Sequence, residues 1–295
     1  MYYIFFDLEG DTAYSKRPGR FINEIIEVGA VRLDKKLNEV DRFDMLIYPE
    51  VFRKLTGRIT QMTGITTQEI VEQGRSFYEV MERFDRWLSK TPDHVLMSWS
   101  TSDLHMLLSN LGYFTDLTTI PFLHRYADFQ RYMQEKLDPE NPGRQISLTA
   151  AAALAGLDES ALHHHRAVDD SVICADLFRT HFDPKCLQKY ILQADVPEFY
   201  ERLHYKPHYI HDLRSPLIAR NEMRFQCPDC GNHAKQRSRY RYCNKAFTAE
   251  FECRGCKTRF VGRVRFKQLY DGVQTIKFIE IPEPESESAG ESVTQ

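Results

Sequence analysis

The sequence lacks a long apolar run, a basic leader and an internal repeat. Of its 295 residues, 42% are hydrophobic and 27% are charged, and no stretch approaches the length of a membrane span. The apolar start is short and Asp7 follows it at once, so it has neither the basic region nor the cleavage site of a signal peptide. These absences predict a cytoplasmic protein with no membrane partner, and the start is interpreted as a buried strand.

Cysteine is sparse outside one short segment. Of the seven cysteines, Cys174 and Cys186 stand alone, whereas the other five lie between Cys227 and Cys256. Because the chain shows no export signal, paired cysteines in such a segment indicate a metal site rather than disulfides.

Positive charge is concentrated near the end of the chain, although the formal net charge is only -3. Residues 206–281 contain 16 Lys and Arg against 7 Asp and Glu, and the rest of the chain is acidic. A basic module favours a polyanionic partner, and an acidic domain could store carboxylates for metal ions. The same asymmetry is also typical of a protein that uses charge only for solubility.

The order of apolar patterns predicts an α/β domain. Phe77, Met81, Phe84 and Leu88 form one stripe of a helix, and β-rich runs precede it. A meander followed by alternating helices and strands is typical of a mixed sheet flanked by helices. The strands are expected at 2–7, 24–33, 37–49, 94–98 and 120–127, and further helices at 102–111, 128–137, 147–157 and 167–182.

Changes in composition divide the chain into four segments. Pro207 and Pro216 favour a connection, and the end is rich in Pro, Glu and Ser. The predicted segments are an α/β domain at 1–183, a connecting segment at 184–224, a small β-rich unit at 225–281 and a disordered acidic tail at 282–295.

Three separate segments carry acidic residues at the ends of predicted elements. Asp7 and Glu9 end the first strand, and alternation points both side chains to one face. Close carboxylates repel each other unless a cation neutralises them, and Mg²⁺ or Mn²⁺ suits an all-oxygen site. Asp103 stands where a strand gives way to a helix, and His165 stands five residues before Asp170 at a helix start. Taken alone, an Asp-x-Glu pair is more often solvated surface charge.

The order Asp-x-Glu, then Asp, then His-x-Ala-x-x-Asp resembles the DEDDh exonucleases, which are DnaQ-like 3′→5′ nucleases with a ribonuclease H-like fold. The resemblance covers roughly residues 1–183, and its most specific part is the run from His165 to Asp170. The runs at 60–66 and 98–100 resemble the branch of KapD-like and Eri-type exoribonucleases. The resemblance implies a ribonuclease H-like mixed sheet for this domain.

The resemblance also implies roles for individual residues. Asp7, Glu9, Asp103 and Asp170 would hold two Mg²⁺ or Mn²⁺ ions, and His165 would be the general base. The implied reaction releases 5′-mononucleotides from single-stranded 3′ ends, with RNA favoured over DNA. The alternatives are a single-stranded DNA exonuclease, a proofreading nuclease in a polymerase complex, and an inactive nuclease-fold adaptor that binds nucleic acid.

Two features depart from the family pattern. Gly10 follows the acidic pair where the family usually has Thr or a larger residue, which alters the expected contacts to the terminal nucleotide.

His163, His164 and His165 stand in a row, and a triple-His metal site is the rival interpretation. Neighbouring side chains on a helix diverge by about 100°, so three in a row do not reach one ion. Ala167 fits the family spacing from His165, which is therefore the predicted base.

The clustered cysteines form two Cys-x-x-Cys knuckles with 22 residues between them. Four thiolates suit one tetrahedral Zn²⁺, and the spacing resembles a zinc ribbon; a pair of redox motifs is the alternative. The predicted ligands of this structural zinc are Cys227, Cys230, Cys253 and Cys256. Cys243 is left over.

Arginines and aromatic residues alternate in the β-rich unit, where strands are expected at 237–242, 247–252 and 259–269. Bases that stack on rings while arginines contact phosphates would explain this pattern, although an ordinary solvated strand alternates in the same way. The predicted nucleic-acid contacts are Arg237, Arg239, Tyr240, Arg241 and Tyr242. A protein partner for the ribbon is the alternative.

Overall fold

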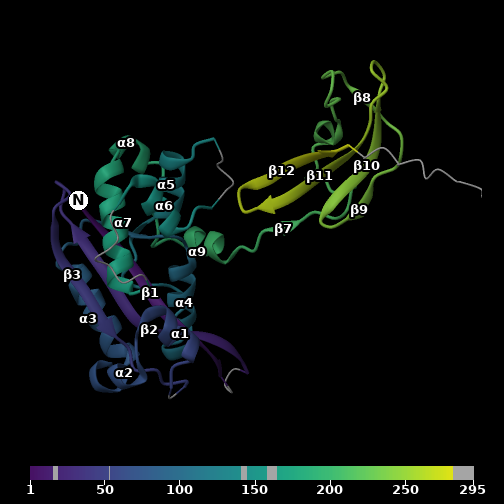
Figure 1. The fold of residues 1–295 in the computed structure, drawn as a ribbon. Helices are drawn as coiled ribbons and strands as arrows, with labels where there is room; N and C mark the ends of the chain where they lie inside the picture. Colours follow the sequence, from purple (N-terminus) through teal and green to yellow (C-terminus); the bar gives the residue numbers. More distant parts are fainter. Residues whose placement is uncertain (16–18, 53, 141–144, 158–164, 282–295) are drawn as a thin grey trace, which may run out of the picture. The chain divides into compact units, whose positions relative to one another are not determined.

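The computed structural model describes residues 1–15, 19–52, 54–140, 145–157 and 165–281. Two compact units, Met1–Leu203 and His204–Gln295, make up the chain (Figure 1). The predicted tail and two of the three consecutive histidines, His163 and His164, lie outside the described residues. Within the described ranges, every helix is too short or too polar to cross a membrane.

A six-stranded mixed sheet forms the centre of the first unit. Its strand order is β3-β2-β1-β4-β5-β6. The pairs β1–β4 and β4–β5 are parallel, and the other pairs are antiparallel. The predicted mixed sheet is therefore confirmed. The strands are β1 (Tyr2–Ser15), β2 (Arg20–Leu33), β3 (Glu39–Leu46), β4 (His94–Ser98), β5 (Arg125–Asp128) and β6 (Ile191–Gln193).

Helices cover both faces of this sheet because alternate residues of β1 are apolar on both sides. Ile4 and Phe6 belong to a core with α3 and α4, whereas Tyr3 and Phe5 belong to a core with α5, α6 and α7. Figure 1 shows α5, α6 and α7 gathered together. The helices are α1 (Gly57–Thr63), α2 (Thr67–Gln73), α3 (Phe77–Ser89), α4 (Ser102–Phe114), α5 (Phe129–Leu137), α6 (Leu148–Ala155), α7 (Ala167–His181), α8 (Pro184–Leu187) and α9 (Pro197–His204).

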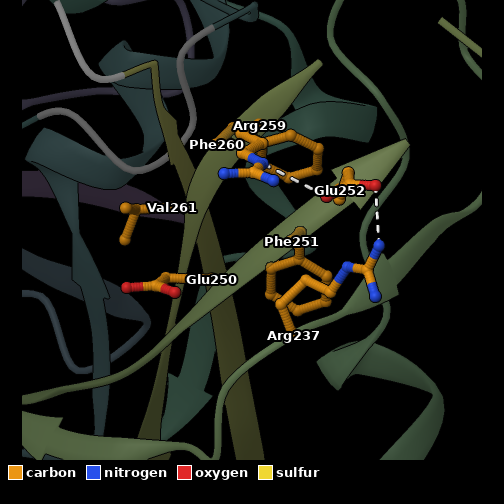
Figure 2. Close-up of a pocket in the computed structure, with 7 residues that line it drawn as sticks. All are labelled: Arg237, Glu250, Phe251, Glu252, Arg259, Phe260 and Val261. Carbon is orange, nitrogen blue, oxygen red and sulfur yellow. Dashed lines mark hydrogen bonds and ion pairs between the residues drawn. The ribbon is translucent and has the colours of Figure 1, made fainter. Parts of the chain in front are cut away.

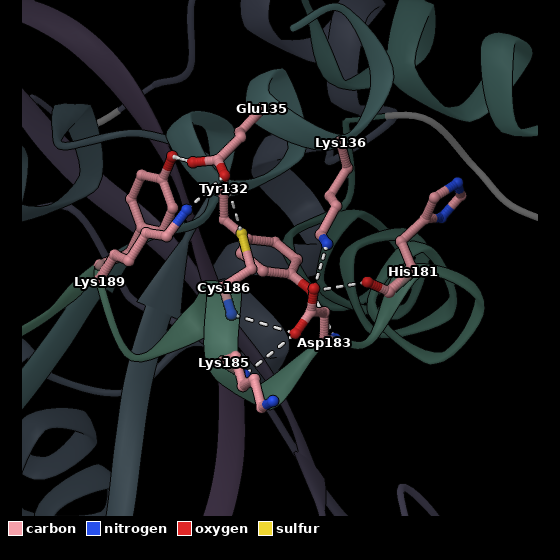
Figure 3. Close-up of polar contacts among 9 residues, drawn as sticks. Tyr132, Glu135, Lys136, His181, Asp183, Lys185, Cys186 and Lys189 are labelled. Carbon is pink, nitrogen blue, oxygen red and sulfur yellow. Dashed lines mark hydrogen bonds and ion pairs between the residues drawn. The ribbon is translucent and has the colours of Figure 1, made fainter.

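A polar cluster anchors the segment after α7 to α5 (Figure 3). The hydroxyl of Tyr132 accepts a hydrogen bond from the amide of Asp183 at 2.9 Å. Lys136 pairs with the Asp183 carboxylate at 2.7 Å, and Lys189 pairs with Glu135 at 2.7 Å. Contacts on both sides of α8 therefore hold this segment in the first unit.

The predicted connecting segment, 184–224, is divided between the two units. Its first part, up to Leu203, packs in the first unit, where Phe199 is buried in the core. Its second part joins the second unit, where Ile210 is buried. Apolar side chains are buried in the first unit before Leu203 and in the second unit after it. The division between the units therefore lies about 20 residues beyond the predicted end of the first domain.

The second unit is a β-sheet with its own apolar core. Its main strand order is β12-β11-β10-β8, with β7 paired to β11 and β9 paired to β10. Large aromatic side chains such as Phe247, Phe251 and Phe260 fill the core. The elements are β7 (His208–Tyr209), a 3₁₀ turn (Arg220–Met223), β8 (Ala234–Gln236), β9 (Arg241–Cys243), β10 (Ala246–Cys253), β11 (Arg259–Leu269) and β12 (Gly272–Glu280).

The predicted strand at 237–242 is confirmed only for its last two residues, which belong to β9, because residues 237–240 separate β8 from β9. The amide of Arg237 donates to the Glu250 carbonyl at 2.8 Å, and the Ser238 hydroxyl accepts from the Glu250 amide at 2.9 Å. The Ser238 hydroxyl thus takes the place of a backbone carbonyl as the acceptor for the Glu250 amide. Serine side chains commonly bond to the backbone in this way in loops.

Candidate active site

Asp7 and Glu9 extend past the point where β1 has a parallel neighbour. Pairing between β1 and β4 ends at Phe5, and the chain after β4 turns into α4. Asp103 is buried in the first turn of α4, and it lies close enough to Asp7 for its charge to raise the pKa of that carboxyl. The third acidic side chain therefore lies directly beside the first two.

Gly29 allows α7 to approach the same end of the sheet. It is the register partner of Asp7. A Cβ atom at Gly29 would lie 2.1 Å from the backbone of Ala167 and Val168, so only glycine fits there. The hydroxyl of Ser171 donates to the Gly29 carbonyl at 3.2 Å. This close approach brings the first turn of α7 next to Asp7.

A buried ion pair fixes the residues that precede α7. The Oε1 atom of Glu27 accepts a hydrogen bond from Nε of Arg166 at 2.8 Å and forms an ion pair with Nη2 at 2.6 Å. Its Oε2 atom accepts from the amide of Ala167 at 2.9 Å. Burial raises the pKa of Glu27, but the hydrogen bonds from Arg166 and Ala167 oppose that rise and fit an ionised carboxylate.

His165 and Asp170 reach the carboxylates of β1 from this anchored segment. His165 has a left-handed backbone with φ of 67°, and its side chain is exposed. One ligand atom each from Glu9, His165 and Asp170 lie within 4.8 Å of one another. The fold thus brings together all five residues that the sequence predicted for this site, from β1, α4 and the start of α7.

The carboxylates of this cluster raise one another's pKa. Burial raises the pKa of Asp7 well above its usual range, and the charges of Asp103 and Asp170 raise it further. Burial, with the charge of Asp170, raises the pKa of Glu9 to about 8, and burial raises that of Asp103 to about 7. A cation would relieve this repulsion, and a set of carboxylate oxygens fits Mg²⁺ or Mn²⁺.

Sequence reasoning missed the residues that position this cluster. The strand predicted at 24–33 contributes no residue to the predicted site, although Glu27 and Gly29 in it hold α7 in place. A fully buried glutamate inside an apolar run was the available signal, because a buried charge requires a partner. Arg166, that partner, occupies the variable position after His165 in the His-x-Ala-x-x-Asp pattern.

The four predicted zinc cysteines converge in the second unit. Their sulfur atoms all lie within 4.8 Å of one another, with 3.4 Å between Cys227 and Cys256 and between Cys230 and Cys253. Gly231 closes the first knuckle with φ of 71°, and its amide donates to the Cys227 carbonyl. Four sulfurs at this spacing match the donor set of a tetrahedral Zn²⁺ site.

Arg237, a predicted nucleic-acid contact, is engaged by a neighbouring carboxylate (Figure 2). Glu252 pairs with Arg237 at 2.7 Å and with Arg259 at 3.2 Å. These residues line a cavity of 760 Å³, beside which the rings of Phe251 and Phe260 stack with centroids 5.6 Å apart. A phosphate at Arg237 would therefore compete with Glu252.

The other predicted contacts differ in exposure. Tyr240 is half-buried against Phe251, and its hydroxyl donates to the Met223 carbonyl, so its ring belongs to the core. Tyr242 keeps 42% of its surface exposed. The exposed members of the predicted set are Arg237, Arg239, Arg241 and Tyr242.

Known proteins resemble the first unit. The model of the exonuclease family RNase_T matches residues 12–178. DNA polymerase III subunit epsilon of Treponema pallidum is 30% identical over 159 residues, which cover 54% of this chain and 68% of that protein. The probable 3′-5′ exonuclease KapD of Bacillus subtilis is 28% identical over 197 residues, which cover 65% and 87% respectively.

A solved structure shares the fold. The nuclease domain of 3′hExo, a DEDDh family member bound to rAMP, matches with a TM-score of 0.53 at 21% identity and covers 65% of this chain and 96% of that one. The predicted ribonuclease H-like architecture is thereby confirmed. Because the family model matches more than half of the sequence, the chain belongs to the exonuclease family.

Proposed function

We propose that this chain is a metal-dependent 3′→5′ exonuclease that releases 5′-mononucleotides from single-stranded 3′ ends. The observation that carries the proposal is the convergence of acidic side chains around Asp7, where Glu9, Asp103 and Asp170 all lie close enough for their charges to act on it. The KapD relative, a probable 3′-5′ exonuclease, supports the direction of digestion.

Asp7, Glu9, Asp103 and Asp170 would hold two Mg²⁺ or Mn²⁺ ions. Their buried, mutually repelling carboxylates support this assignment, because they raise the pKa values that a cation would lower again. When bound, two such ions supply charge stabilisation for both the attacking and the leaving oxygen of an in-line displacement.

His165 is the proposed general base. Its exposed imidazole lies within 4.8 Å of the Glu9 and Asp170 carboxylates, so it can take the proton of a water that attacks the phosphorus. Water and the phosphodiester then give a nucleoside 5′-phosphate and a shortened strand with a free 3′ hydroxyl. Arg166 and Glu27 would keep the imidazole at this position.

RNA is the proposed preferred substrate. The resemblance of residues 60–66 to KapD-like and Eri-type enzymes supports this preference, as does the rAMP bound to the structurally similar 3′hExo domain. The similarity to a DNA polymerase subunit favours the second candidate, a DNA exonuclease with a proofreading role. A pull-down that recovers a polymerase would support that candidate.

The second unit is proposed to be a zinc ribbon that binds nucleic acid or a protein partner. The convergence of four cysteine sulfurs supports a structural Zn²⁺ at Cys227, Cys230, Cys253 and Cys256. The exposed side chains of Arg239, Arg241 and Tyr242 are the proposed contacts for nucleic acid.

The test is digestion of matched RNA and DNA oligonucleotides labelled at the 5′ end, with the full chain and Mn²⁺. We expect a ladder that shortens from the 3′ end, a faster rate on RNA, and near-complete loss in Asp7→Asn and Asp170→Asn. Digestion that begins at the 5′ end, or full activity in both variants, would refute the proposal. Binding without any turnover would favour the inactive adaptor.

A further inference from the structure

β1 and β2 continue beyond the sheet as a two-stranded ribbon. β3 begins to pair with β2 at Glu27, and β4 pairs with β1 only up to Phe5. We call residues 10–15 of β1 and 20–25 of β2 the arm, which projects past α1 in purple in Figure 1. An isolated two-stranded ribbon is marginally stable in water, so contacts to the rest of the unit must support it.

Helix α4 supplies those contacts. The buried side chain of Asn110 donates to the Asn23 carbonyl at 2.8 Å and accepts from the Ile25 amide at 3.1 Å. Further along the arm, the hydroxyls of Ser15 and Tyr113 share a hydrogen bond at 3.2 Å. Because α4 also carries Asp103 in its first turn, the arm is fixed relative to the candidate active site.

Two aromatic rings are exposed on this arm. Tyr14 and Phe21 are register partners, so both side chains lie on one face. Their ring centroids are 5.3 Å apart, and their exposed fractions are 57% and 70%. Aromatic side chains are usually among the most buried in a protein, and exposed rings on a braced ribbon offer flat surfaces on which bases can stack.

A groove lies between the arm and α1. It has a volume of 390 Å³, and its arm side includes Gly10, Thr12 and Asn23, on the same face as Tyr14. Its other side includes the exposed Arg58. Gly10 follows Glu9 directly, so this part of the groove begins one residue from the carboxylates along β1, on the face opposite to the Asp7 and Glu9 side chains.

We propose that the arm binds the substrate strand upstream of the nucleotide being removed, with bases stacked on Tyr14 and Phe21 and a phosphate near Arg58. This inference rests on the proposed exonuclease function. The two exposed rings are inclined at 72° to each other, and a cation lines the groove of the same ribbon. Rings and a cation together match single-stranded nucleic acid, which presents base faces and phosphates in alternation. Five strand residues from Glu9 to Tyr14 span at most about 17 Å. A stacked strand covers that distance in about five nucleotides.

The first test is binding of fluorescent single-stranded oligonucleotides to the full chain, measured by anisotropy as a function of length. Affinity should rise until the strand reaches about five nucleotides. In Tyr14→Leu/Phe21→Leu we expect roughly tenfold weaker binding of longer strands, since leucine keeps apolar bulk but offers no flat ring. The matched Tyr14→Phe and Phe21→Tyr variants retain both rings and should keep the length dependence.

The second test is hydrolysis of the same strands. The leucine variant should show a raised KM for long strands with little change in kcat, and Arg58→Gln should weaken the salt dependence of binding. Unchanged binding in the leucine variant would overturn the inference even if the wild type digests RNA. A wild type that binds through the arm but digests nothing would refute only the proposed activity.

The competing occupant of the arm is a second copy of the chain. Light scattering of the wild type and the leucine variant separates the two cases. We expect the same monomer mass for both, whereas a dimer that dissociates in the leucine variant would assign the rings to self-association and overturn the inference. The rings are largely exposed, so their replacement should leave the melting temperature unchanged.

Discussion

Glu27 and Arg166 are 139 residues apart in the sequence, yet the Glu27 carboxylate forms an ion pair with the guanidinium and accepts one hydrogen bond from it and one from the next backbone amide. The pair connects the centre of β2 to the residue that follows His165. The position of the candidate base therefore depends on a strand that contributes no atom to the proposed reaction.

Breaking this pair should lower both stability and turnover. Glu27→Gln leaves a guanidinium with 25% of its side chain exposed beside a neutral amide, at an expected cost of about 3 kcal/mol. We expect a large fall in kcat and a smaller change in KM, because His165 and Asp170 shift together. Glu39→Gln is the control, since its pair with Arg42 lies at the surface and should contribute less than about 1 kcal/mol. Equal effects of the two variants in urea unfolding would contradict the assigned role.

Gly29→Ala should separate α7 from the sheet. The added Cβ would lie 2.1 Å from the helix backbone, which cannot move without displacing Asp170, and the expected destabilisation is on the order of 3 kcal/mol. Gly57→Ala is a matched control because no atom lies within 4 Å of its added Cβ. Thermal melting of both variants measures the difference, and a Gly29→Ala protein as stable as the control would contradict the close approach.

His165→Ala should slow hydrolysis by roughly 100-fold or more without weakening substrate binding, because a general base acts on the water rather than on the strand. Single-turnover digestion and anisotropy measure the two quantities separately. His124→Ala is the control. This histidine pairs with Asp195 at 3.5 Å and does not belong to the carboxylate cluster. A His165→Ala enzyme that digests at the wild-type rate would remove His165 from the mechanism.

The carboxylate cluster should make the metal-free protein less stable as pH rises. The pKa of Glu9 is raised to about 8 in the folded state. Between the usual pKa of a glutamate and pH 8, the folded state therefore binds more protons than the unfolded state. Stability is therefore lost across that window. We expect the melting temperature in EDTA to fall between about pH 5 and pH 8, and Mg²⁺ or Mn²⁺ to restore it. Glu9→Gln should flatten the decline, and an identical decline in that variant would argue against Glu9 as its source.

Zinc should be required for the fold of the second unit. Cys253 is fully buried in the sulfur cluster, and Cys253→Ser should lose the bound metal and unfold this unit while the first unit remains folded. Elemental analysis should give one zinc per wild-type chain. Cys243→Ser is the control, because Cys243 is exposed and lies outside the cluster. Full zinc content in Cys253→Ser would contradict the assignment.

The candidate site was predictable from sequence to the extent that chemistry fixes residue types and spacing. Alternation places Asp7 and Glu9 on one strand face, but the selection of these residues together with His165 and Asp170 rests on the resemblance of their order and spacing to the DEDDh exonucleases. The requirement for glycine at Gly29 arises only when α7 packs there, which no local pattern encodes. The boundary after α7 escaped prediction for a similar reason, because contacts such as Lys189 to Glu135 join distant segments.

The register between β1 and β2 constrains how this chain can vary in length. Glu9 lies opposite Glu27 and Gly10 lies opposite Ile25, so Ile26 has no counterpart in β1. Deletion of Ile26 would remove the bulge and leave a regular ladder in which Tyr14 and Phe21 stay opposite each other. Deletion of a paired residue such as Glu24 would instead shift the register and turn Phe21 to the other face from Tyr14. Single-residue deletions in β2 should therefore survive in natural variants at the bulge and not at the paired positions between the bulge and Phe21.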